Sequence, residues 1–239
     1  MKITFLGTRG YLDVATRRHY RHASTMITYK GKKVMIDCGL DWHKKVWDIQ
    51  PDAIVITHGH PDHIGGLISG SPCPVYATNE SWEHMKNFPI TQKYTMQPYK
   101  KIDIFGITFQ PFPVVHSLIA PGVGYRITAN KASIFCVHDL ISIDRRHEAL
   151  KGVQLYIGDG ATITRPMVRR KGDKLFGHTT IRAQLGWCQK EKVPRMIVTH
   201  CGTQIVGTDG RKIGARIRAL AKERGVEVKV AYDGMVIEL

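Results

Sequence analysis

The chain lacks any long apolar run. None of its hydrophobic stretches approaches the roughly 18 residues of a membrane-spanning helix, so we expect no membrane segment. The N-terminus, residues 1–7, has the pattern of a strand and no apolar signal region behind it. Repeats, low-complexity tracts and linkers are also absent, and we therefore expect one domain over residues 1–239.

Cysteine and acidic residues are scarce. The five cysteines are an odd number, scattered and without a Cys-x-x-Cys pair, which favours reduced thiols in a cytoplasmic protein over a disulfide framework. Asp and Glu number 20 against 35 Lys and Arg, a formal net charge of +15. Such a balance fits an acidic partner such as RNA or DNA, but by itself it favours nucleic acid only weakly.

Histidine is concentrated in one motif, Thr57-His58-Gly59-His60-Pro61-Asp62-His63-Ile64-Gly65-Gly66, which follows the strand-like run 53–56. Alternate side chains of an extended segment share a face, so His58 and His60 can bind one ion together. Asp62 and His63 lie just beyond the turn and can face a second ion. Imidazole and carboxylate suit zinc, with manganese or iron as alternatives. A polar loop rich in histidine by chance is the competing interpretation.

The motif resembles the signature of the metallo-β-lactamase-fold hydrolases, His-x-His-x-Asp-His followed by Ile-Gly-Gly. The resemblance implies an α/β fold, a four-layer αββα sandwich, with a one- or two-metal site at one edge. It also implies further ligands downstream, and the stretches 113–117, 133–139 and 196–202 supply them. The implied metal ligands are His58, His60, Asp62, His63, His116, Asp139 and His200. Asp139 would bridge two ions, with Asp159 as the alternative, and Asp37 would orient a ligand from behind.

A second resemblance concerns Gly177-His178-Thr179-Thr180, which is similar to the His-Ser-Thr motif of the tRNA 3′-processing endonucleases, the ribonuclease Z family. There the histidine donates a proton to the leaving oxygen, which implies this role for His178. Residues 157–162 partly resemble the His-Glu-Ala-Thr motif, whose acid orients that histidine, and only Asp159 can take the acid's place. The long arm with which those enzymes grasp tRNA has no recognisable counterpart here. A histidine that merely caps or packs at a helix start is the competing interpretation.

Two arginine-rich stretches, residues 9–22 and 161–177, are expected to be loops that flank the metals and bind phosphate, because the guanidinium fork matches phosphate oxygens. The residues expected to contact phosphate are Arg9, Arg17, Arg18, Arg169, Arg170 and Lys171. For residues 9–22 a solvated loop is an equal alternative. Residues 88–101 are also expected to be a loop, and Asn79 is expected to cap a helix that runs to Asn87.

The sequence therefore predicts a cytoplasmic hydrolase with two divalent ions, most consistent with a ribonuclease Z-like phosphodiesterase that uses a metal-bridging hydroxide. Asp62 would hold that hydroxide in line or take its proton. Two alternatives stay open: a hydrolase of a small ester, lactone or cyclic phosphate, and a nucleic-acid-binding module with a vestigial metal site. Homodimers are common among similar proteins, but no part of the sequence locates an interface.

Overall fold

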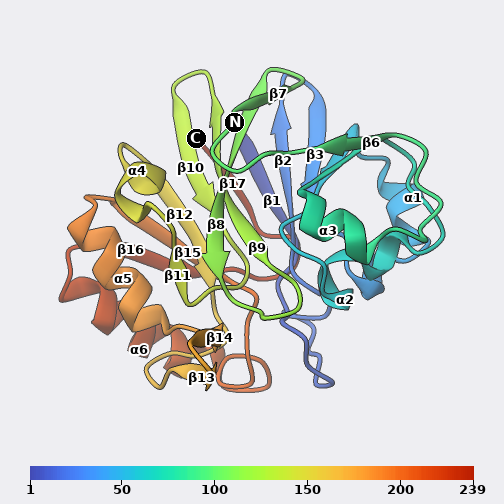
Figure 1. Ribbon diagram of the computed structural model, residues 1–239. Helices are drawn as coiled ribbons and strands as arrows, with labels where there is room; N and C mark the ends of the chain where they lie inside the picture. The colour runs from blue at the N-terminus through green and yellow to red at the C-terminus, as the bar shows by residue number, and fades with distance from the viewer.

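The computed structural model describes all 239 residues. Two β-sheets pack face to face, and helices cover the outer side of each sheet (Figure 1). The predicted αββα sandwich is thus confirmed. The two termini lie side by side, and the amino group of Met1 donates a hydrogen bond of 2.6 Å to the carbonyl of Leu239. None of the helices has the length and apolar character needed to cross a membrane.

The first sheet has the strand order β17-β1-β2-β3-β4-β5-β6. Its strands are β1 (Lys2–Gly7), β2 (Ser24–Tyr29), β3 (Lys32–Ile36), β4 (Ala53–Val55), β5 (Val75–Ala77), β6 (Lys93–Thr95) and β17 (Val236–Glu238). The pairs from β17 to β3 are antiparallel and those from β3 to β6 are parallel. The parallel pairing directs β4, and the histidine motif that follows it, toward the same edge as the end of β3.

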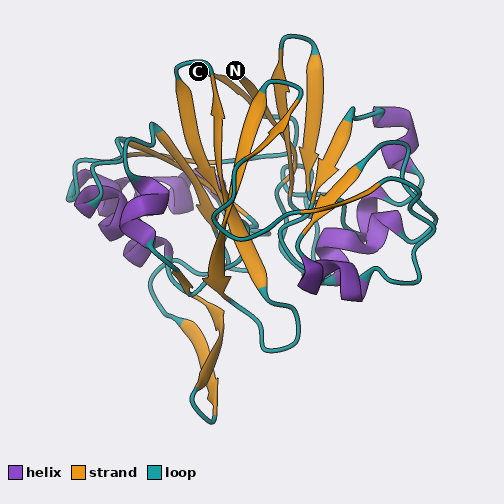
Figure 2. Cartoon of the chain, turned by 45° about the horizontal axis from the view of Figure 1, so that its top comes forward, coloured by secondary structure: helices purple, strands orange, loops and turns teal.

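The second sheet has the order β11-β8-β9-β10-β12-β15-β16, and β7 pairs with β8 beside this path. Its strands are β7 (Ile102–Ile104), β8 (Ile107–Val115), β9 (Gly122–Ala129), β10 (Ala132–Cys136), β11 (Ser142–Ile143), β12 (Leu155–Asp159), β15 (Arg195–Thr199) and β16 (Glu227–Val230). A separate hairpin, β13 (Met167–Lys171) with β14 (Lys174–His178), projects from the body of the molecule (Figure 2).

Helices form the two outer layers. They are α1 (Lys45–Ile49), α2 (Pro61–Ile64), α3 (Asn79–His84), α4 (Arg146–Leu150), α5 (Ile181–Lys190) and α6 (Gly210–Lys222), with 3-10 helices η1 (Leu40–Trp42) and η2 (Gly65–Leu67). Figure 1 shows α1 to α3 on the side of the first sheet and α4 to α6 on the side of the second.

Three apolar clusters hold the four layers together, one at each contact between layers. Strand β4 shows how the sequence builds them: Val55 joins the cluster between the sheets, whereas Ile54 faces the cluster under α1 to α3. Alternate residues of a strand point to opposite faces, so a strand covered on both faces is apolar throughout. Burying each such aliphatic side chain stabilises the fold by about 1.5–3 kcal/mol.

The structure corrects three local predictions. Residues 167–178 form the hairpin β13–β14 rather than a loop. Within the predicted loop 88–101, β6 adds a parallel edge strand to β5. Thr78 rather than Asn79 caps α3, since its Oγ1 accepts the hydrogen bond from Ser81 N, and the helix already ends at His84. The extent of the chain as one domain stays a prediction.

Candidate metal centre

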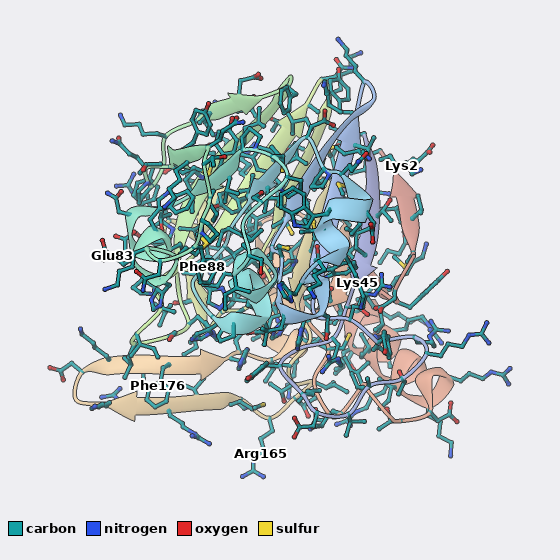
Figure 3. All side chains as sticks on the ribbon, turned by 90° about the vertical axis from the view of Figure 1, so that its right-hand side faces the viewer. Lys2, Lys45, Glu83, Phe88, Arg165 and Phe176 are labelled. Carbon is teal, nitrogen blue, oxygen red and sulfur yellow. The ribbon has the colours of Figure 1, made fainter.

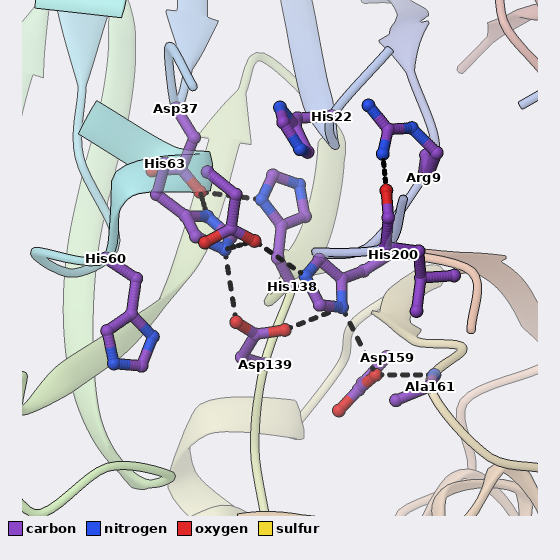
Figure 4. A network of polar contacts seen from close by, with 12 residues as sticks. Arg9, His22, Asp37, His60, His63, His138, Asp139, Asp159, Ala161 and His200 are labelled. Carbon is purple, nitrogen blue, oxygen red and sulfur yellow. Dashed lines mark hydrogen bonds and ion pairs between the residues drawn. The ribbon is translucent and has the colours of Figure 1, made fainter. Parts of the chain in front are cut away.

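The candidate site lies where the ends of several strands meet at one edge of the sandwich. Strands β10, β12 and β15 run parallel, so the side chains at their carboxyl ends reach the same edge. These side chains are Asp139, Asp159 and His200. His116 follows β8, and the motif from His58 to His63 follows β4 of the other sheet. Figure 4 shows side chains from both sheets converging on Asp139.

Four ligand atoms form a first group. His58 Nε2 lies 2.9 Å from His60 Nδ1 and 3.3 Å from Asp139 Oδ2. His116 Nε2 lies 3.3 Å from His60 Nδ1 and 3.4 Å from the same carboxylate oxygen. Three imidazole nitrogens and one carboxylate oxygen at these separations could hold a divalent ion.

A second group contains the same carboxylate oxygen. His63 Nε2 lies 3.1 Å from Asp139 Oδ2 and 3.2 Å from Asp62 Oδ2. His200 completes the group, with Nε2 at 3.3 Å from Asp62 Oδ2 and Nδ1 at 2.7 Å from Asp139 Oδ1. Asp159 Oδ1 lies farther out, 3.7 Å from His200 Nδ1. Asp139 is therefore the carboxylate that the two groups share.

Unpaired polar atoms mark the centre of this cluster. His63 Nε2, Asp139 Oδ1 and His200 Nδ1 are buried and make no hydrogen bond of normal geometry. A buried polar atom left without a partner costs about 1–3 kcal/mol, and a coordinated cation would remove that cost. The donor set of imidazole nitrogens and carboxylate oxygens is one that zinc, manganese and iron accept. The residues present thus fit a divalent metal centre.

Asp37, directly after β3, orients the second group from behind. His63 Nδ1 donates a hydrogen bond of 2.8 Å to its Oδ2, which turns His63 Nε2 toward Asp139. His138 Nδ1 donates to the same oxygen at 2.6 Å, and both groups of Thr57, N and Oγ1, donate to the carboxylate at 2.7 Å. The contact of Asp37 with a ligand was predicted from the resemblance. Sequence reasoning missed His138, because no local pattern links it to Asp37.

Burial sets the charge of the first group. It lowers the pKa of His58 to about 3 and the pKa of His60 to about 4, so both rings are uncharged at neutral pH. The uncharged ring is the form that binds metal. For Asp62 and Asp139, burial opposes ionisation, but the surrounding histidines outweigh it and hold the pKa of each carboxyl below its ordinary value. The first group therefore offers neutral imidazoles and an ionised carboxylate, whereas in the second group the neighbouring carboxylates outweigh burial and raise the pKa of both His63 and His200 well above the ordinary value.

His178, the last residue of β14, stands beside the two groups. Its Nδ1 donates a hydrogen bond of 2.7 Å to Asp159 Oδ2, and Asp139 Oδ1 lies 3.9 Å away. Burial alone would lower the pKa of His178, but the charge of Asp159 and this hydrogen bond outweigh it and raise the pKa above its ordinary value. The side chain keeps 19% of its surface exposed. The structure thus brings together the two residues that sequence analysis paired as proton donor and orienting acid.

Gln184 of α5 holds Asp159 in turn, and sequence reasoning missed it. Its Oε1 accepts hydrogen bonds from Asp159 N at 3.0 Å and Tyr156 Oη at 3.1 Å. Its Nε2 donates to the carbonyl of Asp159 at 2.7 Å. The side chain is fully buried. A glutamine on an amphipathic helix is usually exposed, so the sequence contains no signal that this one faces the end of β12.

A cleft of about 470 Å³ gives access to the centre. Its lining includes His60, Asp62, His116, Asp139, His178 and His200. Tyr11, Leu12 and Met167 line it as well and add apolar surface beside the candidate ligands. Five of the seven candidate ligands and the candidate proton donor therefore face one common space, whereas His58 and His63 are buried behind it.

The predicted phosphate-binding residues of 9–22 are placed differently from expectation. Arg9 is 7% exposed, and its guanidinium donates to Asp41 at 2.7 Å, to the carbonyl of Tyr20 at 3.0 Å and to the carbonyl of Leu12. Three of its five N–H groups are thus used within the fold, and Arg9 lines a cavity beside the metal centre and not the cleft itself. Arg17 and Arg18 line a different cavity, between this loop and the start of α6.

The hairpin carries the other three predicted residues. Arg169, Arg170 and Lys171 are exposed on β13, and the hairpin extends well beyond the sandwich, as the position of Phe176 in Figure 3 shows. Its base is joined to the metal centre, because Gly177 N donates to the carbonyl of His116 at 2.7 Å and Gly177 O accepts from His116 Nδ1 at 3.0 Å. The hairpin and one ligand of the first group are therefore positioned together.

Comparison with known proteins agrees with this geometry. Residues 32–201 match the model of the beta-lactamase superfamily domain, and the chain belongs to this superfamily of metal-dependent hydrolases. Ribonuclease Z of Methanopyrus kandleri is 25% identical, over 98% of this chain and 96% of its own length. Among solved structures, the metallo-beta-lactamase fold protein YhfI from Bacillus subtilis has a TM-score of 0.77 at 17% identity and covers 100% of this chain and 99% of its own. A diphosphatase from the PhnP family has a TM-score of 0.74 at 22% identity, and the match covers 100% of this chain and 97% of the diphosphatase chain.

Proposed function

We propose that this chain is a phosphodiesterase that cleaves nucleic acid, or a nucleotide, and uses two divalent metal ions. Zinc is the metal that suits the ligands best. The proposal rests on one cleft that combines two features. Two ligand groups share Asp139 there, and His178 is hydrogen-bonded to Asp159 beside them. One ion would be held by His58, His60, His116 and Asp139, and the other by Asp62, His63, Asp139 and His200.

Divalent ions bound at these ligands would supply a water of lowered pKa and a Lewis acid toward the phosphoryl oxygen. Asp62, buried against His63 and His200, would hold the attacking water in line and accept its proton. His178, whose pKa is raised by the charge of Asp159, would donate a proton to the leaving oxygen. Asp159 would hold the ring of His178 in position and stabilise its charge.

Charge favours a phosphodiester over an uncharged ester. The exposed residues Arg169, Arg170 and Lys171 stand on a hairpin whose base adjoins the cleft, and a polyanion can contact them while its scissile bond lies at the metals. Two of the similar proteins are named as a ribonuclease and a diphosphatase, which points the same way. A vestigial site is disfavoured because every predicted ligand belongs to one of the two groups.

The test compares two leaving groups. A dinucleotide releases an alkoxide, which needs a proton, whereas bis(p-nitrophenyl) phosphate releases a stable phenolate. With zinc or manganese present, His178→Ala should lower turnover of the dinucleotide by about 100-fold or more, within the range of general acid catalysis, and that of the phenolate ester far less. His147→Ala, which removes an exposed histidine of α4, is the matched control and should change neither.

Other outcomes would contradict the proposal. Hydrolysis of p-nitrophenyl acetate with no cleavage of either diester would move the chain to the small-ester hydrolases. If His178→Ala lowered turnover of both diesters equally, His178 would not be the general acid. Elemental analysis of the purified protein should find two divalent ions per chain, and a single ion would contradict the dinuclear centre.

We further propose that residues 1–239 form one domain and that the protein acts in the cytoplasm. Both sheets contribute to the cluster between them, which supports a single folding unit. All five cysteines are free and buried, as expected in a reducing compartment.

A further inference from the structure

Tyr11 is an exposed aromatic residue in the lining of the cleft at the candidate metal centre, and it has no role in the proposed proton transfers. It lines the same cleft as Asp62, His178 and His200, yet its side chain is 65% exposed. It also lines a neighbouring polar cavity of about 330 Å³ with Arg9 and His22, and its ring centroid lies 5.9 Å from that of His22. Tyr11 therefore stands at the junction between the metal centre and an adjoining hollow.

The backbone on both sides of Tyr11 is fixed although its ring is free. Gly10 N donates a hydrogen bond of 3.0 Å to the carbonyl of Cys201, next to the ligand His200. Leu12 N donates to the carbonyl of Gly10 at 2.9 Å, and Arg9 donates to the carbonyl of Leu12, whose side chain packs against the core cluster. An aromatic ring presented on a fixed backbone can bind a flat partner with little loss of conformational entropy.

Met167 supplies a second exposed apolar side chain in the cleft. It begins β13 and is paired in register with His178, the proposed proton donor. Its side chain is 53% exposed, and it lines the cleft together with Tyr11. The polarizable thioether of methionine adapts to aromatic partners. Two exposed apolar side chains thus adjoin the position of the leaving group and the ligands.

We propose that this surface is a nucleobase subsite, in which a base of the nucleoside attached to the scissile phosphate stacks on Tyr11 and contacts Met167. The inference rests on the proposed phosphodiesterase function and deepens it by naming a nucleoside-containing diester as the substrate. Stacking on an aromatic ring accepts every base, because each has a π face. The subsite therefore selects nucleotides over simple phosphodiesters without selecting a sequence.

The experiment uses substrates that differ only in the base. They are the 5′- and 3′-(p-nitrophenyl phosphates) of thymidine and their abasic counterparts, in which hydrogen replaces thymine. The leaving group is the same in all four, so a difference in kcat/KM measures contact with the base. The metal-loaded wild-type protein should prefer at least one thymidine ester by about 5- to 100-fold, the range expected for one stacked base.

Tyr11→Ala should remove most of that preference. It should lower kcat/KM for the thymidine ester and leave kcat/KM for the abasic ester within about twofold of the wild-type value. Tyr11→Phe, which keeps the ring, should retain the preference. Tyr20→Ala is the matched control, since Tyr20 belongs to the same loop, is 60% exposed and lies outside the cleft lining. It should behave as wild type.

Three results would overturn the inference. A wild-type protein that cleaves thymidine and abasic esters equally has no base contact. Tyr11→Ala that weakens both substrates equally would show that Tyr11 only supports the fold of the loop. If no diester is cleaved with metal present while p-nitrophenyl acetate is, the proposed function itself fails, and the subsite fails with it.

Discussion

At the scale of single residues, the site depends on buried polar side chains that touch no substrate. Asp37 fixes a ligand ring, and Gln184 fixes the backbone of Asp159 through both its amide atoms. These contacts span 26 and 25 residues of sequence. In a low-dielectric interior a satisfied hydrogen bond specifies one geometry, whereas an unpaired partner is costly. Such side chains therefore decide where His63 and His178 point.

We expect Gln184→Leu to destabilise the protein by about 1–3 kcal/mol, because the Asp159 N–H and the Tyr156 hydroxyl lose their acceptor. Urea unfolding measures this change. If Gln184 positions His178 through Asp159, the variant should also lose more turnover with a dinucleotide than with bis(p-nitrophenyl) phosphate. Gln189→Leu, an exposed position of the same helix, is the control. Equal losses on the two substrates would show that Gln184 acts only on stability.

At the scale of elements, the hairpin β13–β14 is the feature that extends beyond the sandwich. Its two strands pair only with each other, so its position is set at its base by the contacts between Gly177 and His116. Gly177 has φ of +117°, and a side chain there would meet the carbonyl of Met167. Only glycine adopts this conformation at this spacing without strain. A rigid base and an exposed basic strand suit an element that holds a polyanion beside the cleft.

Replacing Arg169, Arg170 and Lys171 together by Gln should weaken binding of a single-stranded oligonucleotide and reduce its salt dependence. Each phosphate contact on a single strand adds about 0.7 to the slope of log K against log salt, so three contacts contribute about 2. Fluorescence anisotropy at several salt concentrations measures the slope. Replacing Lys190, Lys192 and Lys222 by Gln removes the same charge elsewhere and should leave the slope unchanged. An unchanged slope in the hairpin variant would exclude phosphate contacts there.

At the scale of the whole molecule, buried polar contacts join distant parts of the chain. His19, in the loop after β1, contacts Thr8 Oγ1 through Nδ1 at 2.8 Å, and that hydroxyl donates to Asp233 Oδ1 at 2.7 Å. His19 Nδ1 must then be the donor, since the hydroxyl has one proton. Burial, aided by the charge of Arg18, lowers the pKa of His19 to about 4. The loop that carries Tyr11 is thereby tied to the C-terminal segment by a neutral histidine.

This pKa makes stability depend on pH. Between about pH 6.5 and pH 4 the unfolded chain binds a proton that the folded chain does not, so the free energy of unfolding falls as pH decreases through this window. With a chelator present, the free energy of unfolding of the wild type should fall by about 1–2 kcal/mol more than that of His19→Gln when the pH is lowered from 7 to 4.5. His147→Gln, a substitution at an exposed position, should show the same pH dependence of stability as the wild type. Parallel stability curves for wild type and His19→Gln would contradict a lowered pKa.

Short motifs and apolar runs were sufficient to predict the candidate ligand chemistry and most of the strands. Apolar runs bounded by turn residues located the strands before His58, Asp139 and His200, because burial on both faces requires a continuous apolar run in the chain. His58, His60, Asp62 and His63 followed from one short motif, which a linear reading contains. His116, Asp139 and His200 were implied by the resemblance of that motif to a known family.

The remaining features depend on tertiary packing, because they are contacts between residues far apart in the chain. Arg169 and its basic neighbours have no apolar alternation, so β13 is visible only through its pairing with β14. Arg9 has the chemistry of a phosphate ligand, yet Asp41 and two carbonyls occupy its guanidinium. His138 and Gln184 acquire their partners only when strands and helices pack. Burial, charge pairing and long-range hydrogen bonds assign these roles, and none of them leaves a local pattern.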